Sequence, residues 1–333
     1  MSGDADGGRA GRGGSPREPI AGGAGPSQGP AVIARGRGHA KVILAGEHAV
    51  VYGHPALAAG LSVGIEATAR PGTGRLRVPA WGLDAAASDD SAVGRALTAI
   101  ARRLEAPALD FDADAAVPSR AGLGSSAALA VAVARAAAAA CGRAADTGAI
   151  DAAVDEAEAI FHGNPSGIDA AAAKSGAAGR FTRADGWRPV PVYQAIRLCV
   201  GLSGRPRDTA AQVAAVARLR DRLSVADDIL ATLGKLADDA AAALAKGDVD
   251  GLGRTFDAAH GLLCALRVSG PELDALVHTA RAAGAIGAKL TGAGGGGAVI
   301  ALAPGHERDV LARWKAAGFE GFMAEIAANE VRA

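Results

Sequence analysis

The stretch Pro118-Ser119-Arg120-Ala121-Gly122-Leu123-Gly124-Ser125-Ser126-Ala127-Ala128 says more about the fold than any other part of this 333-residue sequence. Its two glycines let the backbone approach a ligand closely, and an Ala/Val run of predicted helix begins at the two serines. A helix start offers unpaired N–H groups and the positive end of the helix dipole, so it can hold a phosphate. A serine that caps an ordinary helix explains the same pattern. The doubled serine favours a phosphate loop, because one hydroxyl can cap the helix while the other faces a metal or a phosphate.

A second glycine-rich segment, Lys289-Leu-Thr-Gly-Ala-Gly-Gly-Gly-Gly297, formally matches the GxGxxG pattern. The residues that follow, Ala298 to Ala303, read as a strand, whereas a dinucleotide-binding fingerprint requires a helix there. We therefore exclude a Rossmann site, and the lack of a GxxxxGKS/T motif excludes a P-loop. Close packing against a neighbouring loop or a ligand explains the glycines better.

A third segment places two carboxylates on either side of a Gly/Pro-rich turn. Glu158 lies near the end of a predicted helix over 147–161, and Asp169 follows the turn His162-Gly-Asn-Pro-Ser-Gly167. Carboxylates placed in this way can converge, although each one alone is equally well explained as a solvated surface acid. His162 alone is more often a hydrogen-bonded structural residue than a metal ligand.

The composition excludes several classes of protein. Lys and Arg together number 35, as do Asp and Glu, so no net charge favours nucleic acid or an acidic membrane as a partner. Aromatic residues make up 3% of the chain, so the core must consist of small aliphatic side chains that pack closely. The three cysteines form no disulfide or zinc pattern, which favours a reducing, cytoplasmic location. The apolar run Ala127 to Cys141 is short and contains Arg135, so we predict a buried helix and not a membrane span.

The order of predicted elements indicates an α+β fold. Residues 1–30 contain ten Gly and four Pro and no hydrophobic period, so we predict a disordered tail that is not a signal peptide. Beyond it, strands and helices follow one another without regular alternation, which favours α+β over a doubly wound sheet. Strands are predicted over 41–47, 111–117, 181–199 (with turns), 287–303 (around the glycine loop) and 321–326. Helices are predicted over 90–104, 127–141, 147–161, 168–173, 208–283 (divided at Gly247, Asp248 and Pro271) and 306–317.

These segments, in this order, resemble the GHMP kinase superfamily and, within it, the mevalonate kinase family. Gly122 to Ala128 is similar to the family's phosphate loop. The other matching stretches are Lys41 to Gly53 with Pro55-Ala-Leu-Ala58, Glu158 to Asp169, and Lys289 to Gly297. The resemblance spans residues 35–326. Its departures, Ala45 and Ala298, remove no group with a chemical role.

The resemblance implies a two-domain GHMP kinase fold with the active site in the cleft between the domains. A ribosomal protein S5 domain 2-like, ATP-binding domain would cover 31–190, and a ferredoxin-like α/β domain would cover 191–333. It implies transfer of the γ-phosphoryl group of ATP, with Mg²⁺, to the 5-hydroxyl of (R)-mevalonate, in isoprenoid biosynthesis. Related kinases are often homodimers, so a second copy of the chain is a further expected partner.

The resemblance also assigns roles by position. Asp169 would accept the hydroxyl proton, and Lys41 beside it would keep it ionised and stabilise the transferring group. Ser126 and Glu158 would hold Mg²⁺, which prefers oxygen ligands. The nucleotide would contact Pro118, Gly122, Leu123, Gly124, Ser125, Ser126, Ala127, Gly294 and Gly295. The acceptor would contact Lys41, Glu47, His48, Arg180, Arg207 and Thr209.

Two alternatives remain open at this point. Another GHMP kinase would act on phosphomevalonate, homoserine or a sugar. A non-catalytic module with the same fold would have lost at least one of the four chemical groups above, and Lys41, Ser126, Glu158 and Asp169 are all present. For Arg207 and Thr209, a surface arginine and a helix-capping threonine are equally good explanations.

Overall fold

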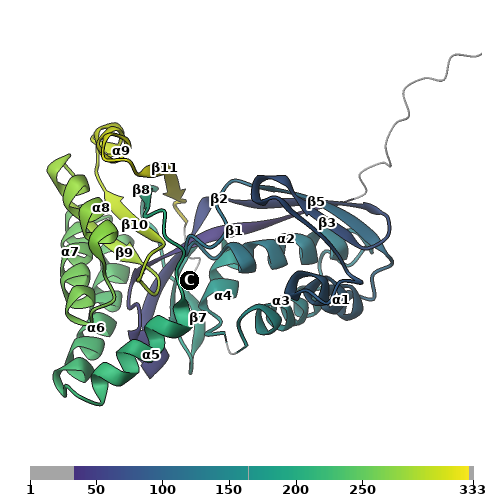
Figure 1. The fold of residues 1–333 in the computed structure, drawn as a ribbon, viewed down its shortest axis with the longest axis horizontal. Coiled ribbons are helices and arrows are strands. Elements are labelled where there is room, and N and C mark those ends of the chain that lie inside the picture. Colours follow the sequence, from purple (N-terminus) through teal and green to yellow (C-terminus); the bar gives the residue numbers. More distant parts are fainter. Residues whose placement is uncertain (1–33, 164, 330–333) are drawn as a thin grey trace, which may run out of the picture. The chain divides into compact units, whose positions relative to one another are not determined.

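The computed structural model describes residues 34–163 and 165–329, which form two β-sheets covered by helices (Figure 1). The tail predicted over 1–30 lies outside the described residues. Both sheets are mainly antiparallel, and the helices occur in runs rather than after every strand. This arrangement confirms the α+β class.

The first sheet has seven strands, in the order β4-β3-β5-β2-β6-β7, with β1 paired to β2. Only β3 and β5 run parallel; the other pairs are antiparallel. Its strands are β1 (Ala34–Ala45), β2 (Ala56–Pro71), β3 (Arg75–Val78), β4 (Leu83–Ala86), β5 (Leu109–Ala115), β6 (Ala178–Thr182) and β7 (Gly186–Pro189). The accompanying helices are η1 (Ala49–Tyr52), η2 (Pro79–Trp81), α1 (Ala92–Leu104), α2 (Ser125–Ala140), α3 (Thr147–His162) and α4 (Ile168–Ser175).

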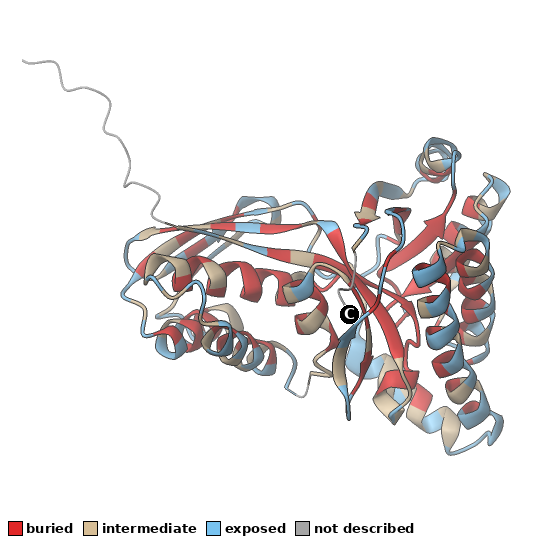
Figure 2. Ribbon diagram, turned by 180° about the vertical axis from the view of Figure 1, so that it is seen from behind, coloured by how far each residue is buried: buried red, intermediate tan, exposed pale blue. Residues whose placement is uncertain are grey.

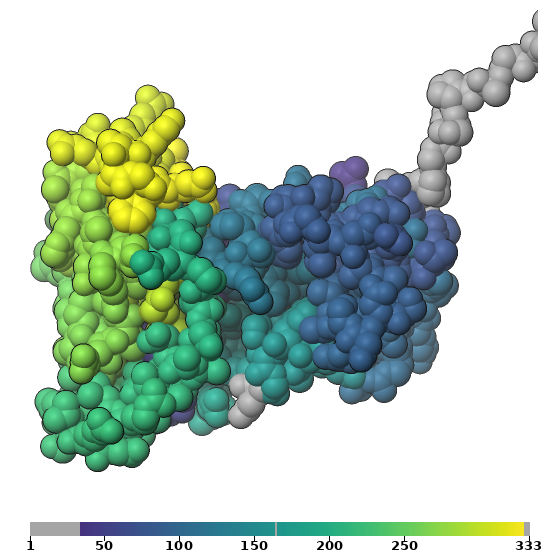
Figure 3. Space-filling model, in the orientation of Figure 1, coloured from purple at the N-terminus to yellow at the C-terminus, as the bar shows by residue number. Residues whose placement is uncertain are grey.

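The second sheet has four antiparallel strands in the order β11-β8-β10-β9. They are β8 (Ile196–Leu202), β9 (Gly287–Thr291), β10 (Ala298–Leu302) and β11 (Glu320–Ile326). The helices of this part are α5 (Thr209–Arg220), α6 (Val225–Lys246), α7 (Val249–Ala265), α8 (Pro271–Ala282) and α9 (Glu307–Ala316). In the space-filling view these helices, drawn in green and yellow, form one continuous stretch of surface (Figure 3).

Small residues let α2 lie directly on β1. A Cβ at Gly36 would stand 2.1 Å from the carbonyl oxygen of Ala132, and one at Gly38 only 2.0 Å from that of Ala128. Both distances are far below van der Waals contact, so only glycine fits at these two strand positions. Eleven of the sixteen residues of α2 are buried, and this helix is mostly red in Figure 2. Close backbone approach thus compensates for the shortage of aromatic side chains.

Most predicted elements are confirmed, but one predicted helix is divided further, and β2 beyond Ala58, β3 and β4 were not predicted as strands. The helix predicted over 208–283 breaks at 221–224 as well as at the predicted positions. No Gly or Pro marks this extra break, where Arg220 forms an ion pair with Asp227 of the next helix. The short strands β3 and β4 were not predicted, since each alternates over only four residues. The boundary near residue 190 stays a prediction; β7 ends at Pro189 and β8, in the second sheet, begins at Ile196.

The predicted buried helix over 127–141 is α2, in the first sheet's core. Among the helices of the described residues, none combines the length and hydrophobicity needed to cross a bilayer.

Candidate functional site

The loop before α2 differs from the prediction in how the helix is capped. Gly122 and Gly124 have φ angles of 85° and 68°, in the left-handed region that favours glycine. Gly124 occupies the N-cap, and no side chain of residues 34–163 or 165–329 accepts a capping hydrogen bond there. The prediction that a serine caps this helix is therefore wrong, because the turn needs a left-handed residue at that position. Ser125 and Ser126 are instead the first two helical residues, and the N–H groups of this first turn have no partner within the helix.

Beneath this loop, Lys41 of β1 meets Asp169 at the start of α4. Lys41 Nζ lies 3.0 Å from Asp169 Oδ1, and the two side chains are 1% and 26% exposed. A Cβ at Gly124 would stand 2.7 Å from Lys41 Cγ, so glycine at this position leaves space for the side chain of Lys41. Burial alone would raise the pKa of Asp169, but the charges of Lys41 and Arg207 outweigh it and hold that pKa below its usual value. Asp169 is therefore ionised at neutral pH.

Glu158, on α3, is a buried acid that interacts with the charge of Asp169. Burial, with the Asp169 carboxylate, raises the pKa of Glu158 to about 8. Its Oε1 has no hydrogen-bond partner among the described residues, which is uncommon for a buried carboxyl oxygen. A hydrogen bond of 2.9 Å joins Ser126 Oγ to His162 Nε2, which lies 4.0 Å from that same Oε1. Sequence reasoning considered His162 only as a structural residue.

Arg207 lies between the two glycine-rich loops. Its side-chain atoms stand 3.2 Å from the position of a Cβ at Gly122 and 2.5 Å from that of a Cβ at Gly292. Its charge also reaches Asp169. Thr209 is the exposed first residue of α5, and Asp208, not Thr209, caps that helix by accepting from the N–H of Ala211. The structure thus places Arg207 between the two glycine-rich loops, where its charge acts on Asp169, and Thr209 at the start of the helix that follows.

The glycine-rich loop joins β9 to β10, so the exclusion of a Rossmann site is confirmed. Gly297 approaches the phosphate loop, since its Cβ would stand 3.1 Å from the carbonyl oxygen of Ala121. Gly294 faces the turn between α7 and α8, since its Cβ would stand 2.0 Å from the carbonyl oxygen of Val268. The N–H of Gly295 donates to the same oxygen, while a Cβ at Gly295 would meet the side chain of Gln212 on α5. Only glycine fits so close to the backbone at Gly294.

A buried ion pair joins the first motif to the third. Glu47 and Lys289, both with fully buried side chains, form a direct ion pair. Burial raises the pKa of Glu47 and lowers that of Lys289, and the charge of each partner opposes these shifts. Thr291 Oγ1 accepts from the N–H of Ile43 at 2.8 Å, and a bond of 2.9 Å joins His48 Nε2 to the carbonyl of Ala293. Sequence reasoning assigned Lys289 no role. The signal that could have revealed its buried ion pair is a single lysine in an otherwise uncharged strand.

Arg180 of β6 forms ion pairs with acidic residues other than Asp169. Its Nε donates to Asp238 Oδ1 at 2.7 Å, and its Nη1 lies 3.8 Å from Asp185. Within residues 34–163 and 165–329, these are its ion-pair partners, so the structure does not bring it to the Lys41–Asp169 pair. Of the remaining nucleotide-side residues, Pro118 is half-buried at the loop entrance, and Leu123 and Ala127 are buried.

The assembled groups suit a multiply charged anion that carries a divalent cation. Two cationic side chains, Lys41 and Arg207, stand near the amide-rich start of α2, whose dipole adds to their attraction for an anion. Ser126 and Glu158 supply oxygen donors, the ligand type that Mg²⁺ prefers. An ionised acid, Asp169, stands beside them to receive a proton.

Comparison with known proteins agrees with this geometry. The family described as GHMP kinases N terminal domain matches residues 91–177, and the family GHMP kinases C terminal matches residues 240–320. Mevalonate kinase of Pyrococcus horikoshii is 36% identical over 88% of this chain and 95% of its own length. Mevalonate kinase of Thermococcus gammatolerans is 34% identical over 88% and 96%.

A solved structure extends the likeness to three dimensions. The crystal structure of L. major mevalonate kinase in complex with R-mevalonate superposes with a TM-score of 0.79 at 27% identity. The match covers 91% of this chain and 99% of that one. The alignments to curated relatives cross both halves of the chain, from the phosphate loop to the glycine-rich loop. The chain is therefore a two-domain member of the GHMP kinase family, and its curated relatives within that family are mevalonate kinases.

Proposed function

We propose that this protein is a mevalonate kinase that transfers the γ-phosphoryl group of ATP to the 5-hydroxyl of (R)-mevalonate. The observation that carries the proposal is the 3.0 Å ion pair between Lys41 and Asp169, close to a buried oxygen of Glu158 that has no hydrogen-bond partner within residues 34–163 and 165–329. This arrangement occurs in a chain whose curated relatives are mevalonate kinases. Cytoplasmic location stays a prediction from the cysteine content.

In the proposed reaction, a bond forms between the acceptor oxygen and the γ-phosphorus while the bond from that phosphorus to the β-phosphate bridge breaks. Asp169 would orient the hydroxyl and take its proton, a role that its lowered pKa and its partial exposure permit. Lys41 would keep Asp169 ionised and stabilise charge on the transferring group. Most of the rate enhancement in such reactions comes from positioning and charge neutralisation.

Residues from the start of α2 and the end of α3 fit a magnesium ion. Glu158, near the end of α3, offers a buried oxygen with no partner among the described residues, and the Ser126 hydroxyl lies on the first turn of α2. Carboxylate and hydroxyl oxygens are hard donors of the kind Mg²⁺ takes. When bound, the ion would neutralise charge on the triphosphate. Ser126 and Glu158 would hold it, with His162 orienting the serine hydroxyl.

The residues predicted to contact the acceptor differ in how they could do so. Arg207 lies beside both glycine-rich loops and acts by its charge on Asp169, so it would contact a carboxylate or phosphate oxygen, as a guanidinium does well. Glu47 and His48 are buried, so they would act by fixing the end of β1. Arg180, paired with Asp238, would need to exchange that partner to reach the acceptor, and Thr209 would approach from α5.

An acceptor screen tests the proposal. Purified full-length protein with Mg²⁺ and ATP is assayed for ADP release with (R)-mevalonate, phosphomevalonate, homoserine and galactose, and we expect turnover with mevalonate only. Asp169→Asn should lower kcat about 10²-fold or more while nucleotide binding persists. Asp239→Asn, at an exposed position of α6, is the matched control and should keep full activity. Preference for another acceptor would assign a different GHMP kinase, and no turnover with any acceptor would favour the non-catalytic module.

A further inference from the structure

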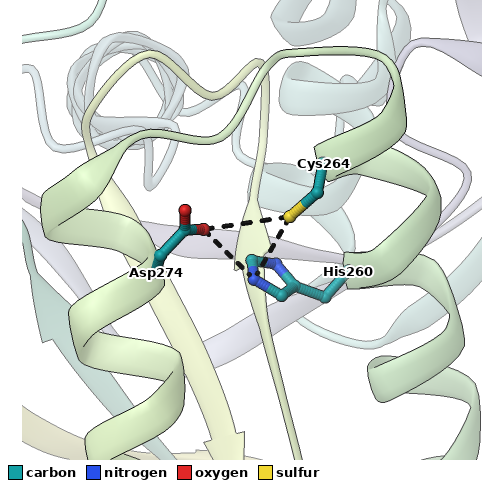
Figure 4. A group of neighbouring side chains, drawn as sticks. All are labelled: His260, Cys264 and Asp274. Atoms are coloured by element: carbon teal, nitrogen blue, oxygen red, sulfur yellow. Dashed lines mark hydrogen bonds and ion pairs between the residues drawn. The ribbon is translucent and has the colours of Figure 1, made fainter.

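Three potential metal ligands converge between α7 and α8, outside the site described above (Figure 4). Cys264 Sγ lies 3.6 Å from His260 Nε2 and 3.8 Å from Asp274 Oδ1, and the histidine nitrogen lies 3.5 Å from the same oxygen. His260 is buried and Cys264 is exposed, so the cluster opens to solvent on the thiol side. Neither residue nor Asp274 takes part in the proposed reaction.

The three distances agree with the edges of a tetrahedral coordination shell. Zinc lies about 2.3 Å from cysteine sulfur and roughly 2.0–2.2 Å from histidine nitrogen and carboxylate oxygen. With tetrahedral angles, these bond lengths place the donor atoms about 3.4–3.6 Å apart. The observed spacing of 3.5, 3.6 and 3.8 Å leaves room for such an ion after a shift of a few tenths of an ångström.

The fold itself produces this convergence. His260 and Cys264 are four residues apart on α7, so they share one face of the helix. The chain then reverses, and Pro271 starts α8, which carries Asp274 in its first turn toward that face. Ser269 Oγ, in the connecting turn, donates to Asp274 Oδ1 at 2.5 Å and holds the carboxylate in place, as an outer-shell partner does.

We propose that His260, Cys264 and Asp274 form a binding site for a zinc-class divalent cation, with water in the fourth position. Imidazole nitrogen with thiolate sulfur selects Zn²⁺ or Co²⁺ over Mg²⁺, which takes oxygen ligands. Three protein ligands and one open position are the arrangement of exchangeable zinc sites, whereas closed structural sites have four. The proposal does not depend on the proposed kinase activity.

The protonation states of the ligands set how the ion enters. Burial lowers the pKa of His260 to about 4, so the ring is neutral at pH 7. The N–H of Leu290 donates to Nδ1 at 3.5 Å, so in the metal-free protein the ring proton is on Nε2. Binding moves this proton to Nδ1, breaks that long hydrogen bond and releases the thiol proton. The site is therefore weaker than one whose Nδ1 already donates to an acceptor.

Cobalt spectroscopy tests the site directly. The full-length, metal-free protein is titrated with Co²⁺ in excess Mg²⁺, which fills oxygen-only sites, and absorption from thiolate-to-cobalt charge transfer is recorded. We expect one equivalent to bind with this band and Zn²⁺ to displace it. Ser269→Ala should weaken binding about 10-fold, as loss of an outer-shell partner does.

The cysteine variants decide the outcome. Cys264→Ala changes an exposed side chain, so it should fold normally, as circular dichroism would check, and should lose the band. Cys141→Ala is the matched control at a half-buried cysteine on another helix end and should keep it. A wild-type protein without the band, or a band that persists in Cys264→Ala, would overturn the proposal.

Discussion

Replacing Lys289 by methionine should destabilise the protein strongly, because it leaves a buried carboxylate without its cation. Lys289 Nζ forms the ion pair with Glu47 and also donates to the carbonyls of Leu290, at 2.8 Å, and Ile43, at 3.2 Å. Both charged side chains are fully buried, so water cannot substitute for the lost ammonium. Removing one partner of such a pair typically costs about 3–5 kcal/mol.

The loss should depend on pH in a defined direction. Burial raises the pKa of Glu47 in the folded protein even with Lys289 present, and the variant removes the charge that opposes this shift. In the folded variant Glu47 therefore keeps its proton at pH values above the ordinary glutamate pKa, where Glu47 of the unfolded chain has already lost it. Its stability falls as pH rises from about 4.5, so the difference from wild type is larger at pH 8 than at pH 5.

A double-mutant cycle measures the pair itself. Urea unfolding, followed by tryptophan fluorescence, is compared for Lys289→Met, Glu47→Gln and the double variant. The double variant removes both charges, so it should lose only about 1–3 kcal/mol for the carbonyls left without a donor. Lys174→Met, at a partly exposed pair with Asp151, is the control and should lose less than about 1 kcal/mol. Additive effects of the two single changes, within about 0.5 kcal/mol, would refute the reasoning.

Three further predictions follow from buried or crowded positions. Glu158→Gln should be more stable than wild type above pH 5 in metal-free buffer. The pKa of Glu158 is about 8 in the folded protein and lower in the unfolded chain, so wild type loses up to about 1.4 kcal/mol of stability per pH unit between these two pKa values. Equal pH slopes of the two proteins in urea unfolding would contradict this. Gly38→Ala should cost at least about 1–3 kcal/mol because its Cβ would stand 2.0 Å from a backbone oxygen, whereas Gly261→Ala, in open space on α7, should gain about 0.5–1 kcal/mol in thermal unfolding. Arg207→Gln should lower kcat/KM for ATP at least about 10-fold, and unchanged steady-state kinetics would remove it from the site.

Sequence reasoning predicted those parts of the molecule that have local signals. Glycine-rich loops and helical periods predicted most of the element types, and the resemblance to the GHMP kinases predicted that Lys41 and Asp169 share one site. Contacts between residues distant in sequence gave no such signal. The partner of Glu47 and the ligand set around Cys264 depend on how β9 and α8 come to lie beside β1 and α7. The cap of α2 was misjudged because serine preference at N-caps is an average, and the left-handed turn at Gly124 overrides it.

The separation of Glu47 and Lys289 by 242 residues has a consequence for the newborn chain. At ordinary rates of translation, the ribosome needs roughly 10–50 s to reach Lys289 after Glu47 has been made. During that interval the acid at the end of β1 has no ammonium to meet, so this end of the strand must stay hydrated. The first sheet can therefore reach its final buried state only after β9 has been synthesised, and chaperones that shield exposed apolar strands would act in this period.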